Sequence, residues 1–138
     1  MNFLGEQIFN VNFLNLFNSL DSESWLHKKN LASTQEENKN QCFQEVHSLR
    51  QKHLKNLFFG HLNVNSLRNK FESIELLIKK NFDVFLISES KLDSSFPGAQ
   101  FFIPEYRIFR KDRNANGGGL FFYVNEDIPC KKIENFQF

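Results

Sequence analysis

One segment of the chain has apolar residues at helical spacing, and a short apolar run lies on each side of it. The helical positions recur every three or four residues and are Leu67, Phe71, Ile74, Leu77 and Ile78. This spacing predicts a helix that begins at Ser66 as the N-cap and ends at 79–81. The runs 57–64 and 83–88 predict strands, and the absence of alternation in the second is typical of a strand buried on both faces. Together they predict a β-α-β unit.

Two more apolar runs, 106–111 and 120–124, predict a further pair of strands. Asn114, Asn116 and three glycines at 117–119 lie between them. Such a turn-rich connection between two strands is the signal of a β-hairpin. The second part of the chain therefore predicts an α/β domain over residues 57–138.

Residues 1–56 have a different character, with one glycine and no proline. They predict a helical extension with a linker: a helix over 3–19, a short turn capped by Asp21 or Ser22, a polar linker over 30–40 and a helix over 35–55. The apolar stripe of the last helix is more often a surface that packs on its own domain, and the alternative is that it binds a partner or a membrane surface.

Composition narrows the function classes. The 138 residues suit one small domain, and the net charge of +1 excludes a strong basic field over the whole chain. Two cysteines, Cys42 and Cys130, do not make a disulfide scaffold and favour an intracellular location. No apolar run has the roughly 18 residues of a membrane span. The first residues lack the basic leader of a secretory signal, so no membrane partner is expected.

Polar residues lie at the carboxyl ends of the first two predicted strands. The first strand ends in Asn63, Val64, Asn65 and Ser66, and the second ends in Ser88, Glu89, Ser90 and Lys91. Because the carboxyl ends of parallel strands meet at one sheet edge, Asn63 or Asn65 and Glu89 could converge on one ion. Mg²⁺ takes one or two carboxylates together with waters and phosphate oxygens. In the alternative interpretation, Asn65 and Ser66 only cap the helix and Glu89 is a solvated carboxylate.

Three motifs carry a resemblance to a known family: HLNVNSL at 61–67, ISESKLD at 87–93 and NGGGLFFYV at 116–124. In this order and spacing they resemble the start of an endonuclease/exonuclease/phosphatase domain, and most of all the endonuclease domains of non-LTR retrotransposons, which precede a reverse transcriptase. The resemblance covers residues 57–133. It implies the first half of a two-sheet sandwich with outer helices, preceded here by the α-helical N-terminal extension.

The resemblance also implies a site and a substrate. Asn63 would be the first metal-site residue, Asn65 a second polar residue near the metal, and Glu89 the Mg²⁺-binding carboxylate. Members of this family cleave a phosphodiester by activating water against a metal-polarised phosphate. The retrotransposon enzymes nick DNA, which implies DNA as the partner and a nuclear location.

The later motifs of the family do not occur in these 138 residues. There is no G-D-x-N strand end and no S-D-H or I-D-H motif, and all four histidines precede Asn63. The expectation is a fragment of a Mg²⁺-dependent DNA endonuclease that is inactive alone and binds Mg²⁺ weakly. The alternatives are a nuclease half that another chain completes, and a nucleic-acid- or protein-binding fragment without catalysis.

A basic cluster accompanies two aromatic residues on one predicted strand. Its members are Arg107, Arg110, Lys111 and Arg113, beside Tyr106 and Phe109. The cluster suits contact with a DNA backbone. More often such a cluster is the solvated face of an edge strand, where charge prevents edge-to-edge pairing.

Overall fold

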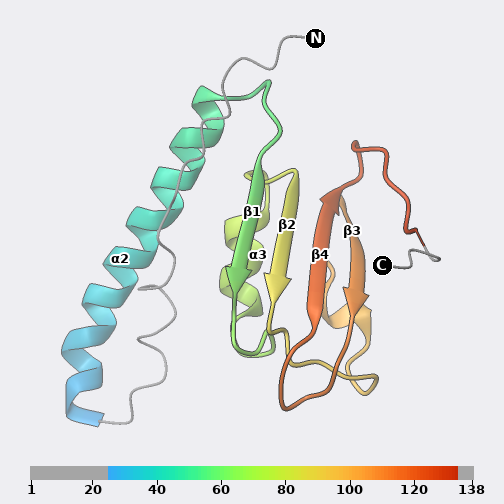
Figure 1. The fold of residues 1–138 in the computed structure, drawn as a ribbon. Coiled ribbons are helices and arrows are strands. Elements are labelled where there is room, and N and C mark those ends of the chain that lie inside the picture. Colours follow the sequence, from blue (N-terminus) through green and yellow to red (C-terminus); the bar gives the residue numbers. More distant parts are fainter. Residues whose placement is uncertain (1–24, 134–138) are drawn as a thin grey trace. The chain divides into compact units, whose positions relative to one another are not determined.

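A computed structural model describes residues 25–133 as a mixed α/β structure, which confirms the predicted class. Its elements are α2 (Trp25–Lys52), β1 (Phe59–Asn63), α3 (Phe71–Ile78), β2 (Val84–Ser88), the 3₁₀ turn η2 (Gly98–Phe101), β3 (Tyr106–Lys111) and β4 (Leu120–Asn125). The four strands form one mixed sheet in the order β1-β2-β4-β3 (Figure 1). The resemblance implies a two-sheet sandwich, and the described residues form one of its sheets at most.

The predicted β-α-β unit and the predicted hairpin both form. β1 and β2 pair in parallel, from Phe59 opposite Val84 to Asn63 opposite Ser88, with α3 between them in the chain. β3 and β4 pair antiparallel as the hairpin, and β4 also pairs antiparallel with β2. The carboxyl ends of β1 and β2 therefore share one edge of the sheet.

The helix between β1 and β2 starts later than the sequence predicts. Ser66 is not its N-cap, because α3 begins at Phe71 and its N-cap position is Lys70. The backbone N–H groups of Ser66 and Leu67 are already bonded to the carbonyl oxygens of Glu89 and Ser90. The chain thus remains paired with the segment after β2, and this pairing postpones the helix.

The predicted linker over 30–40 is wrong, because α2 runs without interruption through it. The segment contains glutamate, glutamine, lysine and alanine and has no glycine or proline, so nothing in it breaks a helix. A boundary between two compact units falls inside α2, between Ser48 and Leu49. The predicted helix over 3–19 and the cap at Asp21 or Ser22 lie outside the described residues.

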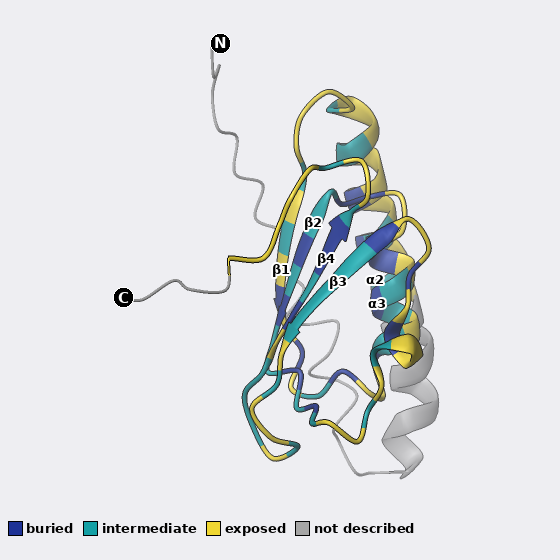
Figure 2. Ribbon diagram, turned by 90° about the vertical axis from the view of Figure 1, so that its right-hand side faces the viewer, coloured by how far each residue is buried: buried dark blue, intermediate teal, exposed yellow. Residues whose placement is uncertain are grey.

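One face of the sheet carries the core of the unit that contains it. Its fully buried side chains include Phe85, Ile87, Phe121 and Tyr123 from the sheet and Ile74, Leu77 and Ile78 from α3. The hydroxyl of Tyr106 donates to the carbonyl oxygens of Ile78 (3.0 Å) and Phe82 (2.6 Å), and its burial raises the pKa of Tyr106 to about 12. These contacts fix the sheet against α3, which lies along one side of it (Figure 2).

The other face of the sheet is only partly covered. Burial alternates along β2, where Phe85 and Ile87 are buried and Leu86 is partly exposed (Figure 2). The prediction that this strand is buried on both faces is therefore wrong for the described residues. Phe59 at one edge is 65% exposed and Leu120 is 41% exposed. We call this side the open face, and its apolar members are the partly or fully exposed Phe59, Val84, Leu86, Phe109, Leu120 and Phe122, together with Val124, which is buried.

No helix within residues 25–133 is long and apolar enough to cross a membrane. Cys42 is a buried free thiol, and Cys130 is an exposed free thiol.

Candidate functional site

The carboxyl ends of β1 and β2 bring together the residues that the sequence analysis singles out. Asn63 is the last residue of β1 and lies opposite Ser88, the last residue of β2. Glu89 is the next residue after Ser88, so it follows directly from the position paired with Asn63. Asn63 and Asn65 are exposed, and Glu89 is partly exposed. We call this group of residues the strand-end site.

The pairing of the two segments continues past the strands. Three backbone N–H groups on the β1 side donate to three consecutive carbonyls on the β2 side: Val64 to Ser88 (3.1 Å), Ser66 to Glu89 (2.9 Å) and Leu67 to Ser90 (3.0 Å). We call these three bonds the ladder. The ladder holds the backbone of Asn65 and Glu89 side by side, and it replaces the helix-cap role that the alternative interpretation assigns to Asn65 and Ser66.

The carboxylate of Glu89 is oriented by the glycine-rich hairpin. Its Oε2 accepts a hydrogen bond from the backbone N–H of Gly118 at 2.8 Å. The backbone N–H of Lys91 donates to the carbonyl of Gly118 at 3.0 Å, so the hairpin is also tied to the segment after β2. The sequence pattern predicts these glycines only as a turn. No local pattern indicates that one of their N–H groups reaches residue 89.

Backbone conformations of higher energy gather at this edge. Among the described residues, six non-glycine residues have positive φ, and four of them are here: Asn65 (46°), Ser66 (92°), Glu89 (55°) and Lys91 (52°). Left-handed backbone is unfavourable for residues with a Cβ, and such residues cluster at functional sites. Their concentration beside two hydrogen-bonded loops supports a functional role for the strand-end site.

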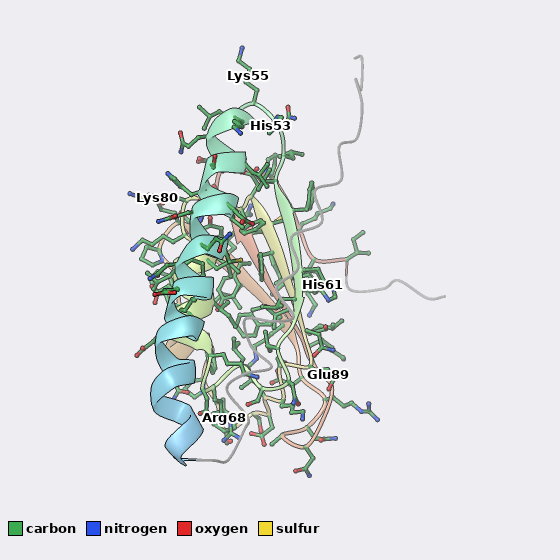
Figure 3. The ribbon with its side chains drawn as sticks, turned by 90° about the vertical axis from the view of Figure 1, so that its left-hand side faces the viewer. His53, Lys55, His61, Arg68, Lys80 and Glu89 are labelled. Carbon is green, nitrogen blue, oxygen red and sulfur yellow. The ribbon has the colours of Figure 1, made fainter. Side chains whose placement is uncertain are left out.

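His61 joins the same edge, although the sequence gives it no evident partner. It lies on β1 two residues before Asn63, so both side chains project from the same face. Its Nε2 lies 3.0 Å from the Oγ of Ser88. Figure 3 shows His61 beside the strands and Glu89 further toward the strand ends on the same side. The alternation of side chains along β1 predicts that His61 and Asn63 share one face, but it does not predict the contact between His61 and Ser88.

The basic cluster on β3 does not form one surface. Arg110 lies on the covered face, where it binds both carboxylate oxygens of Asp112 (2.9 and 2.6 Å) and the carbonyls of Phe96 and Asp93. Its guanidinium is thus used within the fold.

The other three cations of the cluster are scattered. Arg107 and Lys111 alternate with Arg110 and so belong to the open face, where Arg107 donates to the carbonyls of Ile128 and Cys130. Arg113 lies in the hairpin connection, with its side chain against Gly118. Of the four cations only Lys111 and Arg113 are exposed, so at most these two are freely available to contact a DNA backbone.

The donor set at the strand-end site suits a hard cation. Asn63 and Asn65 offer amide oxygens and Glu89 offers a carboxylate, and Mg²⁺ prefers oxygen ligands supplemented by waters. Within residues 25–133 no group of three or more His, Cys, Asp and Glu side chains could hold a metal ion. The residues therefore fit part of a Mg²⁺ site, with one carboxylate, and do not fit a fully protein-ligated one. Comparisons of the chain with protein-family models, with curated proteins and with solved structures find no match.

Proposed function

We propose that this chain carries the Mg²⁺-binding edge of a phosphodiester-cleaving endonuclease that acts on DNA, of the endonuclease/exonuclease/phosphatase type and similar to the retrotransposon enzymes. The observation that carries the proposal is the register of the two parallel strands, which sets Asn63 opposite Ser88 and Glu89 immediately beyond it. The order of the three sequence motifs supports the same function.

Each residue of the site has a defined task in this proposal. Glu89 supplies the anionic ligand, oriented by the Gly118 N–H, and Asn63 supplies a neutral oxygen from the neighbouring strand. Asn65 is exposed beside them and is available to a substrate phosphate or to a metal-bound water. When bound, Mg²⁺ would supply the polarisation of a phosphate oxygen. The 138 residues contain none of the family's later Asp, Asn and His motifs, which position water and contact the scissile phosphate.

Titration with Mg²⁺ tests the proposed site. We expect the amide signals of Asn63, Glu89 and Gly118 in a ¹⁵N NMR spectrum to shift with an apparent dissociation constant no tighter than about 1 mM, because one carboxylate gives little charge for the ion. Glu89→Gln keeps an oxygen that can accept from Gly118 and removes the charge. It should weaken binding by about tenfold or more.

Glu126→Gln is the matched control, because Glu126 is exposed in the turn after β4, at the opposite end of that strand from Gly118 and Gly119. It removes one negative charge and should leave the Mg²⁺ affinity unchanged within about twofold, since exposed charges at a distance are screened. An absence of shifts in the unsubstituted chain up to tens of millimolar Mg²⁺, or equal weakening by both substitutions, would refute the site.

A second test concerns catalysis. We expect the 138-residue chain to leave supercoiled plasmid DNA intact in the presence of Mg²⁺, because one carboxylate and one amide do not activate water. Gel electrophoresis of the plasmid measures nicking, with a commercial nuclease of this mechanism as the positive control. Nicking that Glu89→Ala abolishes would show instead that these residues suffice for cleavage.

The open face supports the finer fold that the resemblance implies. A sheet normally buries both faces when its strands have apolar residues on both, and the described residues cover the apolar side chains of the open face only in part, leaving Phe59 and Leu120 exposed. We propose that a second β-sheet packs there, which makes this sheet one layer of a sandwich. The alternative of a nuclease half that another polypeptide completes uses the same face.

A further inference from the structure

A buried lysine contacts the backbone of the segment that contains Asn65 and has no role in the function proposed so far. Lys70 is 8% exposed, and its Nζ donates to the carbonyl oxygen of Val64 at 2.6 Å and lies 3.5 Å from that of Asn65. Removing an ammonium group from water is costly unless strong hydrogen bonds replace the lost hydration. Both of its acceptors are backbone carbonyls of the segment that follows Asn63.

That segment has an unfavourable backbone that needs support. Asn65 and Ser66 have φ of 46° and 92°, in the left-handed region that a Cβ disfavours. Lys70 stands at the N-cap position of α3, so its backbone is fixed by the helix while its side chain reaches back to the loop. Charge-assisted hydrogen bonds are stronger than neutral ones. The hydrogen bonds from Lys70 are therefore well suited to stabilise the orientation of the Val64 and Asn65 carbonyls in this unfavourable backbone.

The same segment connects the two proposed ligands. Asn63 lies immediately before it, and the Ser66 N–H within it donates to the Glu89 carbonyl. A change in the conformation of 64–66 would thus move Asn63 and loosen Glu89 together.

We propose that Lys70 is a positioning residue that holds the 64–66 segment so that Asn63 and Glu89 present their oxygens to one Mg²⁺ ion; this rests on the proposed function. The residue does not touch the ion. It acts through the two carbonyls and the ladder. Residues that orient metal ligands from behind typically change metal affinity by about 10–100-fold when they are replaced.

The sign of the effect separates positioning from simple electrostatics. A buried cation close to the site repels a divalent cation, so removal of the Lys70 charge alone would strengthen Mg²⁺ binding. Loss of positioning weakens it. Lys70→Met retains the length and the apolar stem and removes both the charge and the donor, so the two explanations predict opposite changes.

The test compares Lys70→Met with Lys79→Met in the full chain. Lys79 is the exposed C-cap of the same helix, so its replacement makes the same change in net charge away from the site. Mg²⁺ titration followed by amide NMR signals should show about tenfold weaker binding in Lys70→Met and a change within about twofold in Lys79→Met. Lys70→Arg, which keeps charge and donors, should restore most of the affinity. In metal-free protein, hydrogen exchange at the Ser66 and Leu67 amides should accelerate in Lys70→Met alone.

The outcomes distinguish this inference from the function on which it rests. If the unsubstituted chain shows no Mg²⁺ response, the proposed function fails and this inference fails with it. If the unsubstituted chain responds and Lys70→Met binds Mg²⁺ equally or more tightly, only the role of Lys70 is refuted. Should Lys70→Met not fold, Lys70→Gln takes its place with the same expected weakening, because its shorter side chain does not reach both carbonyls; unchanged affinity in that variant refutes the role.

Discussion

Replacement of Gly119 by alanine should destabilise the protein by about 2–4 kcal/mol, the sum of overpacking and left-handed backbone strain. Gly119 has φ of 94°, and a Cβ at this position would overlap the Oγ of Ser90, which is fully buried. Two hydrogen bonds tie the two segments together, from the N–H of Ser90 to the carbonyl of Gly119 (3.4 Å) and from the N–H of Lys91 to the carbonyl of Gly118 (3.0 Å). Urea unfolding followed by circular dichroism measures the loss.

Gly117 is the matched control for this substitution. A Cβ there meets no atom within 4 Å, and Gly117 is not among the glycines with positive φ. Gly117→Ala should therefore be neutral or stabilising by up to about 1 kcal/mol, since alanine restricts the unfolded chain. Equal effects of the two substitutions would contradict the close packing of Gly119 against Ser90.

The Ser90 hydroxyl makes the same test more specific. Its Oγ is buried without a hydrogen-bond partner among the described residues, so Ser90→Ala alone should change the unfolding free energy by less than about 1 kcal/mol. In combination with Gly119→Ala it removes the overlapping atom. The double variant should therefore lose about 1 kcal/mol less unfolding free energy than the sum of the two single substitutions. If the two single effects on the unfolding free energy simply add, the destabilisation by Gly119→Ala does not come from the contact with Ser90.

Substitution of two adjacent phenylalanines of β4 should change the free energy of unfolding by very different amounts. Phe121 is fully buried against the core, and Phe122 lies on the open face and is partly exposed. Phe121→Thr should lower the free energy of unfolding by about 3–5 kcal/mol, because it leaves a cavity and a buried hydroxyl. Phe122→Thr should cost only about 1 kcal/mol, because little apolar area is lost there and threonine suits a strand.

Dye binding supplies the second readout for the open face. An apolar face without its second sheet should bind a hydrophobic fluorescent dye in the folded state and promote association between copies of the chain. Phe122→Thr together with Phe109→Thr, its register partner on β3, should reduce that fluorescence without unfolding the chain. A stable monomer with negligible dye binding, or equal destabilisation by Phe121→Thr and Phe122→Thr, would show that the open face is already covered.

The candidate site could be predicted in part because its two ends lie on elements with strong local signals. Asn63 and Glu89 each follow an apolar run, and the helix between the runs forces them into parallel strands that end at one edge. The remaining parts of the site come from long-range pairings. Neither the bond from Gly118 to Glu89 nor that from Lys70 to Val64 follows from a spacing in the sequence.

The sequence by itself determined the β-α-β unit, the hairpin and the buried side of α3, because apolar runs predict strands and a period of 3.6 residues records which side of a helix is buried. Only the tertiary structure decided that β4 lies between β2 and β3, that Arg110 faces inward and that α3 starts at Phe71 rather than at Ser66. Each of these depends on hydrogen bonds between segments far apart in the chain. Such bonds are chosen by competition among all available partners, and a local pattern of hydrophobic and polar residues does not encode that competition.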